Sequence, residues 1–81
     1  MARSPKTSDS VRMAKAVGRE VRKRRVAAGL SQEQLAEALG VHRTQIGFIE
    51  RGENTTSIHT LAQIAVCLRS SASEVLQSIG Y

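Results

Sequence analysis

The stretch Ser31–Gly52, SQEQLAEALGVHRTQIGFIERG, decides the fold of this chain, because it predicts two short helices joined by a tight turn. Ser31, with Gln34 three residues later, has the spacing of a capping box, which gives hydrogen-bond partners to free N–H groups at a helix start. Gly40 suits the left-handed conformation in which helices often end. A second helix follows and stops at Gly52.

The second helix, predicted over residues 43–51, has two different faces. At 100° per residue, Ile46, Ile49 and Glu50 point inward. The outward residues are Arg43, Thr44, Gly47 and Arg51, with Gln45 and Phe48 on the flanks. This outer face suits insertion into the major groove of DNA. The alternative is an ordinary surface corner of two helices with a polar outer face.

Composition and length predict a small all-α protein. Eighty-one residues make one domain, which would gain stability from dimerisation. One Tyr, one Phe and no Trp leave an aliphatic core. The single cysteine, Cys67, lies in an apolar helix, which favours a buried thiol in a reducing cytoplasm over a redox sensor. No apolar run reaches the roughly 20 residues of a membrane span. We therefore expect a cytoplasmic protein without membrane contact.

Positive charge is concentrated at the N-terminal end. Residues 1–28 carry a net +7 and residues 29–81 a net −2, which gives the overall +5. This asymmetry fits a polyanionic partner such as DNA, and a solvated basic surface is the alternative. Residues 1–9 are predicted to be a disordered basic arm of open function, and residues 10–81 the folded domain.

Three further helices complete a predicted bundle of five. The first runs from Ser10 to Ala28, the fourth begins after the cap Ser57, and the fifth begins after Ser71 with Glu74 in a second capping box. The apolar stripe of the fourth comprises Ile58, Leu61, Ile64, Ala65 and Leu68.

The central stretch resembles the helix-turn-helix of the Cro/cI-type (XRE) family of transcriptional regulators. The residues that carry the resemblance are Gln32, Leu35, Ala36, Gly40, Ile46, Ile49, Glu50, Arg51 and Gly52. The similarity extends from about Val17 to Leu76. It implies a compact five-helix bundle of the lambda-repressor-like DNA-binding type, with the helix-turn-helix in the second and third helices. Arg24 and Ser70 depart from the family, which usually has apolar residues there.

Geometry and resemblance together nominate DNA contacts. Arg43 is the first choice for reading a base, because its guanidinium can donate two hydrogen bonds to guanine. Gln32 matches a family glutamine that touches the DNA backbone. The role of Phe48 has two alternatives: contact with a thymine methyl group, or packing against the loop after Gly52. We interpret Gly47 as leaving the centre of the reading face without a side chain. The remaining candidates are Thr44, Gln45, Arg51 and Asn54.

The resemblance also implies a structural ion pair and a dimer. Phage repressors of the family join the first and third helices by an Arg–Glu pair that matches Arg25 and Glu50. Family members bind palindromic operators as dimers, with two reading helices about 34 Å apart. The candidate interface residues, which could instead complete the monomer core, are Val66, Val75, Ile79 and Tyr81.

Within the family, VHRTQIGFIERG is similar to the HRTYIS-x-IERG signature of restriction–modification controller proteins. These bind upstream of their own and the endonuclease gene, as one dimer or as two dimers on adjacent sites. Gln45, Asn54 and Thr55 depart from that signature. A Cro-like phage or mobile-element autorepressor, and an antitoxin that sequesters a toxin, are the alternatives.

Nothing in the sequence predicts an enzyme. His42 and His59 are the only histidines, and no His, Cys or carboxylate set has metal-ligand spacing. There is no glycine-rich phosphate loop. No metal, cofactor or small-molecule ligand is therefore expected.

Overall fold

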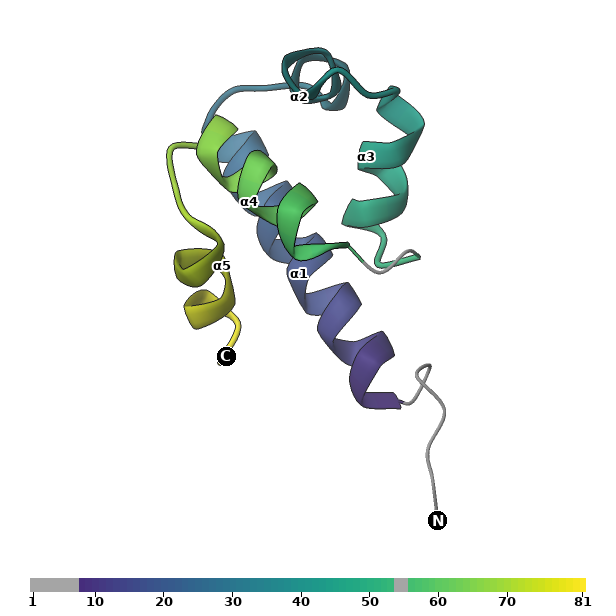
Figure 1. Cartoon of the computed structure of the whole chain (residues 1–81). Coiled ribbons are helices and arrows are strands. Elements are labelled where there is room, and N and C mark those ends of the chain that lie inside the picture. The colour runs from purple at the N-terminus through teal and green to yellow at the C-terminus, as the bar shows by residue number, and fades with distance from the viewer. Residues whose placement is uncertain (1–7, 54–55) are drawn as a thin grey trace.

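Five α-helices form the described part of the chain, residues 8–53 and 56–81 of a computed structural model. They are α1 (Ser8–Ala27), α2 (Gln32–Leu39), α3 (Arg43–Glu50), α4 (Ile58–Cys67) and α5 (Ala72–Ser78) (Figure 1). These residues contain no strand. The predicted all-α fold and its five helices are confirmed.

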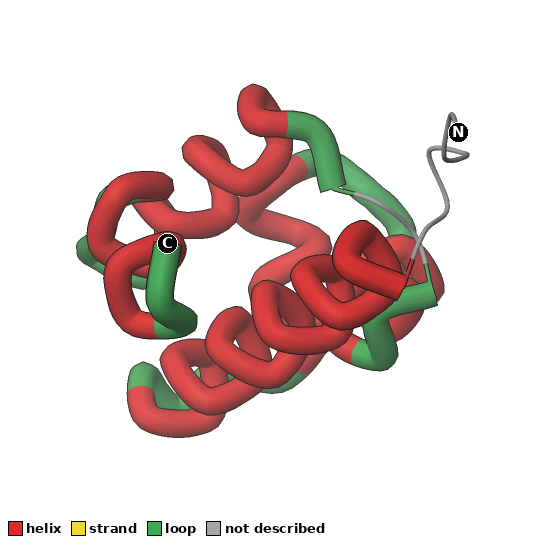
Figure 2. The backbone as a smooth tube through the Cα atoms, turned by 90° about the horizontal axis from the view of Figure 1, so that it is seen from below, coloured by secondary structure: helices red, strands yellow, loops and turns green. Residues whose placement is uncertain are grey.

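The helices contact one another in a closed ring. The long α1 packs against α3 and α5, which lie on opposite sides of it in Figure 1. The ring is completed because α2 packs against both α3 and α4, and α4 packs against α5. Figure 2 shows the helices from below, arranged around an interior. The apolar core side chains fill this interior.

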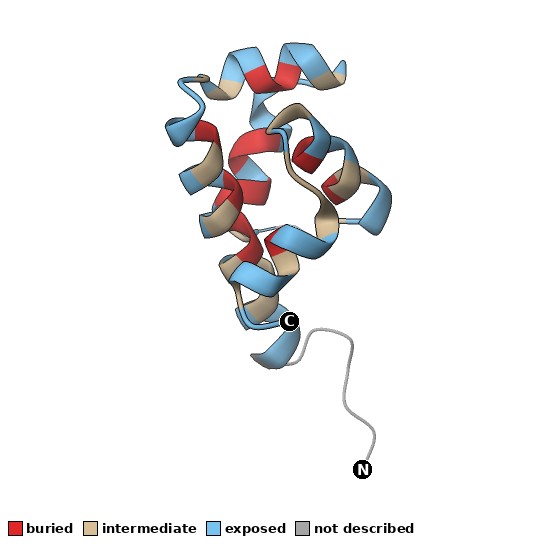
Figure 3. Cartoon of the chain, turned by 90° about the vertical axis from the view of Figure 1, so that its left-hand side faces the viewer, coloured by how far each residue is buried: buried red, intermediate tan, exposed pale blue. Residues whose placement is uncertain are grey.

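The core is aliphatic, as the composition predicts, and every helix contributes to it. The largest fully buried side chains are one from each helix in chain order: Val21, Leu35, Ile46, Ile64 and Val75. Figure 3 colours the buried residues red along the helices. Burying a branched aliphatic side chain contributes about 1.5–3 kcal/mol, so this cluster fixes how the five helices meet.

Local capping sets where the helices begin and end. The Ser31 N–H donates to Gln34 Oε1 at 2.8 Å and the Gln34 N–H donates to Ser31 Oγ at 3.0 Å, so the capping box is complete. Gly40 ends α2 with φ of 71°. Ser57 caps α4 and Ser71 caps α5 through their hydroxyl oxygens. The predicted starts of these three helices are confirmed.

Two details differ from the prediction. α1 begins at Ser8 and ends at Ala27, so residues 8 and 9 of the predicted arm are helical, and residues 1–7 lie outside the described residues. Ile58 is exposed and not buried, because it is the first residue of α4 and lies beyond the ring of core side chains. It lines a groove together with Met13 and Leu76.

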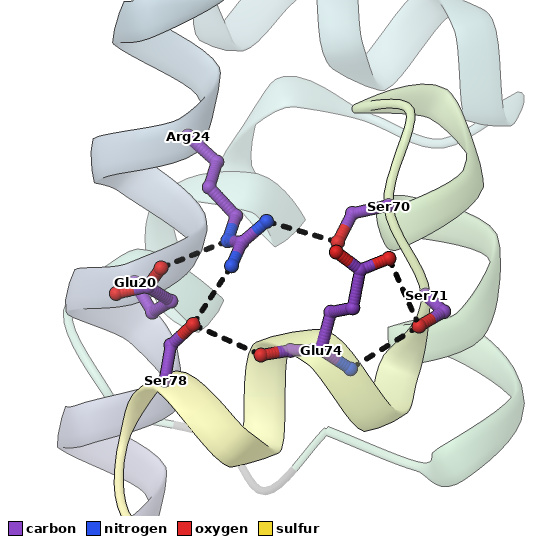
Figure 4. Close-up of polar contacts among 6 residues, drawn as sticks. All are labelled: Glu20, Arg24, Ser70, Ser71, Glu74 and Ser78. Carbon is purple, nitrogen blue, oxygen red and sulfur yellow. Dashed lines mark hydrogen bonds and ion pairs between the residues drawn. The ribbon is translucent and has the colours of Figure 1, made fainter.

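The family departures Arg24 and Ser70 contact each other (Figure 4). Arg24 of α1 donates from Nη1 to Ser70 Oγ at 2.9 Å, in the α4–α5 connection. Its Nη2 donates to Ser78 Oγ of α5 at 2.8 Å, and its Nε donates to Glu20 Oε2 at 2.8 Å. A polar clamp therefore joins α1, α5 and the α4–α5 connection at the edge of the core.

Candidate DNA-binding site

The turn between α2 and α3 holds the two helices at a fixed angle. Ala36 is buried where they approach, and its carbonyl oxygen accepts hydrogen bonds from the N–H groups of Gly40 and Val41. His42 then caps α3, because its Nδ1 accepts from the Thr44 N–H at 3.2 Å. Sequence reasoning missed this cap, since histidine is not among the usual N-cap residues.

The C-terminal end of α3 lies directly against α1. A Cβ atom at Gly18 would overlap the carbonyl oxygen of Ile49 and lie 2.6 Å from that of Glu50. A Cβ atom at Gly52 would lie 2.6 Å from Lys15 Cγ. Two glycines therefore allow an approach that any side chain would prevent, and this contact sets the orientation of α3.

A buried ion pair joins the same helices. Arg25 and Glu50 are 8% and 7% exposed. Arg25 Nε lies 2.6 Å from Glu50 Oε2, and Arg25 Nη2 lies 3.1 Å from Oε1. The Gln32 amide donates to Glu50 Oε1 at 3.0 Å, and Arg25 Nη1 donates to the Leu30 carbonyl at 2.7 Å. The pair that the resemblance implies is thus present and ties α1, α2 and α3 together.

The outer face of α3 is free to meet a partner. Arg43, Thr44 and Gln45 are all exposed in its first turn. The Thr44 hydroxyl lies 2.9 Å from His42 Nδ1. Gln32 lies at the start of α2, where its amide nitrogen is engaged by Glu50. The structure therefore brings three of the proposed contacts to one exposed surface.

Arg51 covers the centre of that face. Its Nη1 lies 3.0 Å from the position a Cβ atom would take at Gly47, which is buried. The interpretation of Gly47 as a bare centre is therefore wrong, because the guanidinium fills the space. Arg51 Nε donates to Glu53 Oε2 at 2.7 Å, and its Cζ lies 5.3 Å from the centroid of the Phe48 ring.

The environment of Arg51 favours its charged form. The hydrogen bond to Glu53 raises the pKa of Arg51; desolvation opposes the rise and the charge of Glu53 adds to it. Phe48 remains exposed beneath the guanidinium, so both readings of its role stay open. Asn54 lies outside the described residues.

The four candidate dimer residues differ in exposure. Val66 and Tyr81 are 70% and 64% exposed, and Ile79 is half-buried. Val75 is only 1% exposed within one chain. Its assignment to a dimer interface is therefore wrong, because it is the inward residue of the short α5 and packs in the core.

Among residues 8–53 and 56–81, no three His, Cys, Asp or Glu residues are grouped as a metal site would require. In the same residues, no helix combines the length and the apolar character needed to cross a membrane. Cys67 is half-buried at the end of α4.

A capped helix with an exposed polar face, locked onto a partner helix by a glycine turn, defines the helix-turn-helix class of DNA-binding proteins. The chain belongs to the HTH_3 helix-turn-helix family of XRE type, whose model matches residues 21–75. It is a DNA-binding transcriptional regulator.

Related proteins are regulators as well. The chain is 45% identical over 60 residues to the control protein C.SmaI of Serratia marcescens, which covers 74% of this chain and 71% of that protein. The solved restriction–modification controller protein C.AhdI of Aeromonas hydrophila has a TM-score of 0.75 and 33% identity, over 79% of this chain and 97% of that one. The clp gene regulator ClgR of Corynebacterium glutamicum has a TM-score of 0.79 and 30% identity, over 83% and 71%. The resemblance to controller proteins is thereby confirmed.

Proposed function

We propose that this protein is a restriction–modification controller that binds palindromic operators as a homodimer. The observation that carries the proposal is the exposed row Arg43, Thr44 and Gln45 on a helix whose orientation is fixed by the Arg25–Glu50 pair. The identity to a control protein supports the sub-family. The operators would lie upstream of its own gene and of an endonuclease gene. The protein would act in the cytoplasm.

Each contact has a proposed role. Arg43 reads a guanine through two hydrogen bonds. Thr44, Gln45 and Asn54 contact neighbouring bases or phosphates, and Gln32 contacts the backbone. The basic α1 adds attraction that does not depend on sequence and falls steeply with salt.

The dimer is proposed to form through α4 and the C-terminal end of the chain at α5. The remaining candidate contacts are Val66 of α4 and, just after α5, Ile79 and Tyr81. Val66 is 70% exposed in the single chain, so Val66→Glu should leave the monomer folded. We expect this variant to halve the mass measured by sedimentation. Val26→Glu is the matched control, because Val26 is also an exposed valine but lies on α1. An unchanged mass for Val66→Glu would remove α4 from the interface.

The function is tested by a gel-shift titration on the DNA upstream of the gene, at two salt concentrations. The wild type should bind tightly, in steps of one and then two dimers, and less tightly at the higher salt. Arg43→Ala should abolish these steps. Binding that is weak throughout and indifferent to Arg43 would contradict the proposal and favour an antitoxin that sequesters a protein.

A further inference from the structure

The guanidinium of Arg51 has three neighbours, and all three lie on α3 or just after it. Glu53 accepts a hydrogen bond from Nε at 2.7 Å. The Phe48 ring lies 5.3 Å from Cζ, and Gly47 supplies the space beside Nη1. These contacts favour one position of the Arg51 side chain on the outer face of α3.

The hydrogen bond at Nε decides which donors remain. Within the described residues, Nη1 and Nη2 of Arg51 make no hydrogen bond, so this end of the guanidinium keeps its donors. Guanine presents two acceptors, O6 and N7, on its major-groove edge, and arginine binds them with two parallel N–H groups. An arginine that a carboxylate orients at Nε can offer its other end to that edge at a smaller cost in side-chain entropy.

The carboxylate also argues against a phosphate as the partner of Arg51. A phosphate at Nη1 and Nη2 would lie within a few ångströms of the negative charge of Glu53, and like charges at that range repel. The neutral edge of guanine carries no such penalty. The ion pair is about half exposed on both sides, so it is open to a groove and not enclosed in the fold.

We propose that Arg51 is a second guanine-reading arginine, and that Glu53 is the positioning residue that aims it across Gly47. The proposal rests on the proposed DNA binding and goes beyond it, because it assigns a specificity role to an acidic residue at a surface that binds a polyanion. It also gives Gly47 a function: the absence of a side chain makes room for the guanidinium.

The test is selection of binding sites from a pool of randomised DNA duplexes, followed by sequencing. Wild type should enrich a palindromic motif. Arg51→Ala should lose the preference for guanine at one position of each half-site, by roughly 5- to 150-fold, and keep the others. Glu53→Gln should weaken the preference at that same position while overall DNA affinity stays equal or rises, because a negative charge is removed.

Glu37→Gln is the charge control, because Glu37 is an exposed acidic residue of α2 and its substitution removes the same negative charge. It should raise affinity for all sequences and leave the motif unchanged. If Glu53→Gln behaves in the same way, Glu53 only repels DNA and the positioning role is overturned. A motif unchanged in Arg51→Ala overturns the reading role.

Gly47→Ala tests the position of the Arg51 guanidinium without destabilising the fold. The new Cβ would meet only the far end of the Arg51 side chain, so the guanidinium moves and the fold stays. We expect an unchanged or higher melting temperature, because alanine favours a helix over glycine, together with the loss of the Arg51-dependent preference. Retention of that preference would contradict the proposal. If wild type enriches no motif, the proposed function itself fails, which is a different result from loss at one position.

Discussion

Replacing Glu50 by glutamine should destabilise the domain by about 3 kcal/mol, because it leaves the buried Arg25 cation without its counter-charge. Both residues are under 10% exposed, so water cannot replace the lost partner. The glutamine can still accept one hydrogen bond, which places the effect at the lower end of the usual range for a broken buried pair. A domain of this size is stable by roughly 4–12 kcal/mol, so the loss is a large fraction.

The assay is urea unfolding followed by helical circular dichroism. With a slope near 1.5 kcal/mol per molar urea, the midpoint should fall by about 2 M. Glu53→Gln is the control, because it breaks an exposed pair that contributes at most about 1 kcal/mol. The double variant Arg25→Met/Glu50→Leu should recover much of the loss, since apolar residues can replace a buried pair. An unchanged midpoint in Glu50→Gln would refute the reasoning.

Three further changes test other parts of the fold. Ser31→Ala should destabilise by about 1 kcal/mol in the same urea assay, because the α2 capping box is lost; no shift would mean that the cap is dispensable. Gly18→Ala should destabilise by about 1–3 kcal/mol despite favouring a helix, since its methyl group would overlap the backbone of α3; a stabilised variant would contradict the close contact. Arg24→Ala should speed amide hydrogen exchange in α5 and not in α2 or α3, because the polar clamp is lost. Arg22→Ala, the control, should not change exchange in any of these helices. Equal protection of α5 in both variants would show that the clamp is not needed.

Local signals in the sequence predicted the helix boundaries well. The capping box at Ser31 and the left-handed Gly40 depend on residues within one turn, so their spacing is enough to locate them. The Arg25–Glu50 pair joins residues far apart in sequence, and only the family resemblance implied it. Gly18 is a further local signal, because a glycine inside a long helix is unfavourable by about 1 kcal/mol, which indicates a close approach.

The positions that the sequence did not predict correctly depend on which side chains pack over them in the folded chain. The sequence shows that Val75 is apolar, but it does not distinguish a core position from a dimer contact. The packing of α5 places Val75 in the core. Similarly, Gly47 was correctly placed on the outer face of α3, but the space above it is filled by the long side chain of Arg51, four residues later. The helical pattern shows which face a residue lies on, but it does not show where a long side chain on that face extends.

The central claim is that the exposed face of α3, held by the buried ion pair, reads DNA sequence. The most direct measurement is the ratio of dissociation constants for the upstream DNA and a shuffled duplex of the same length, compared between Arg43→Gln and Arg69→Gln. Both variants lose one positive charge from an exposed arginine. We expect Arg43→Gln to reduce the ratio by roughly 5- to 150-fold for each half-site of the operator while salt-sensitive binding to both duplexes persists, and Arg69→Gln to leave the ratio unchanged. A ratio that is the same in Arg43→Gln as in wild type would contradict the account.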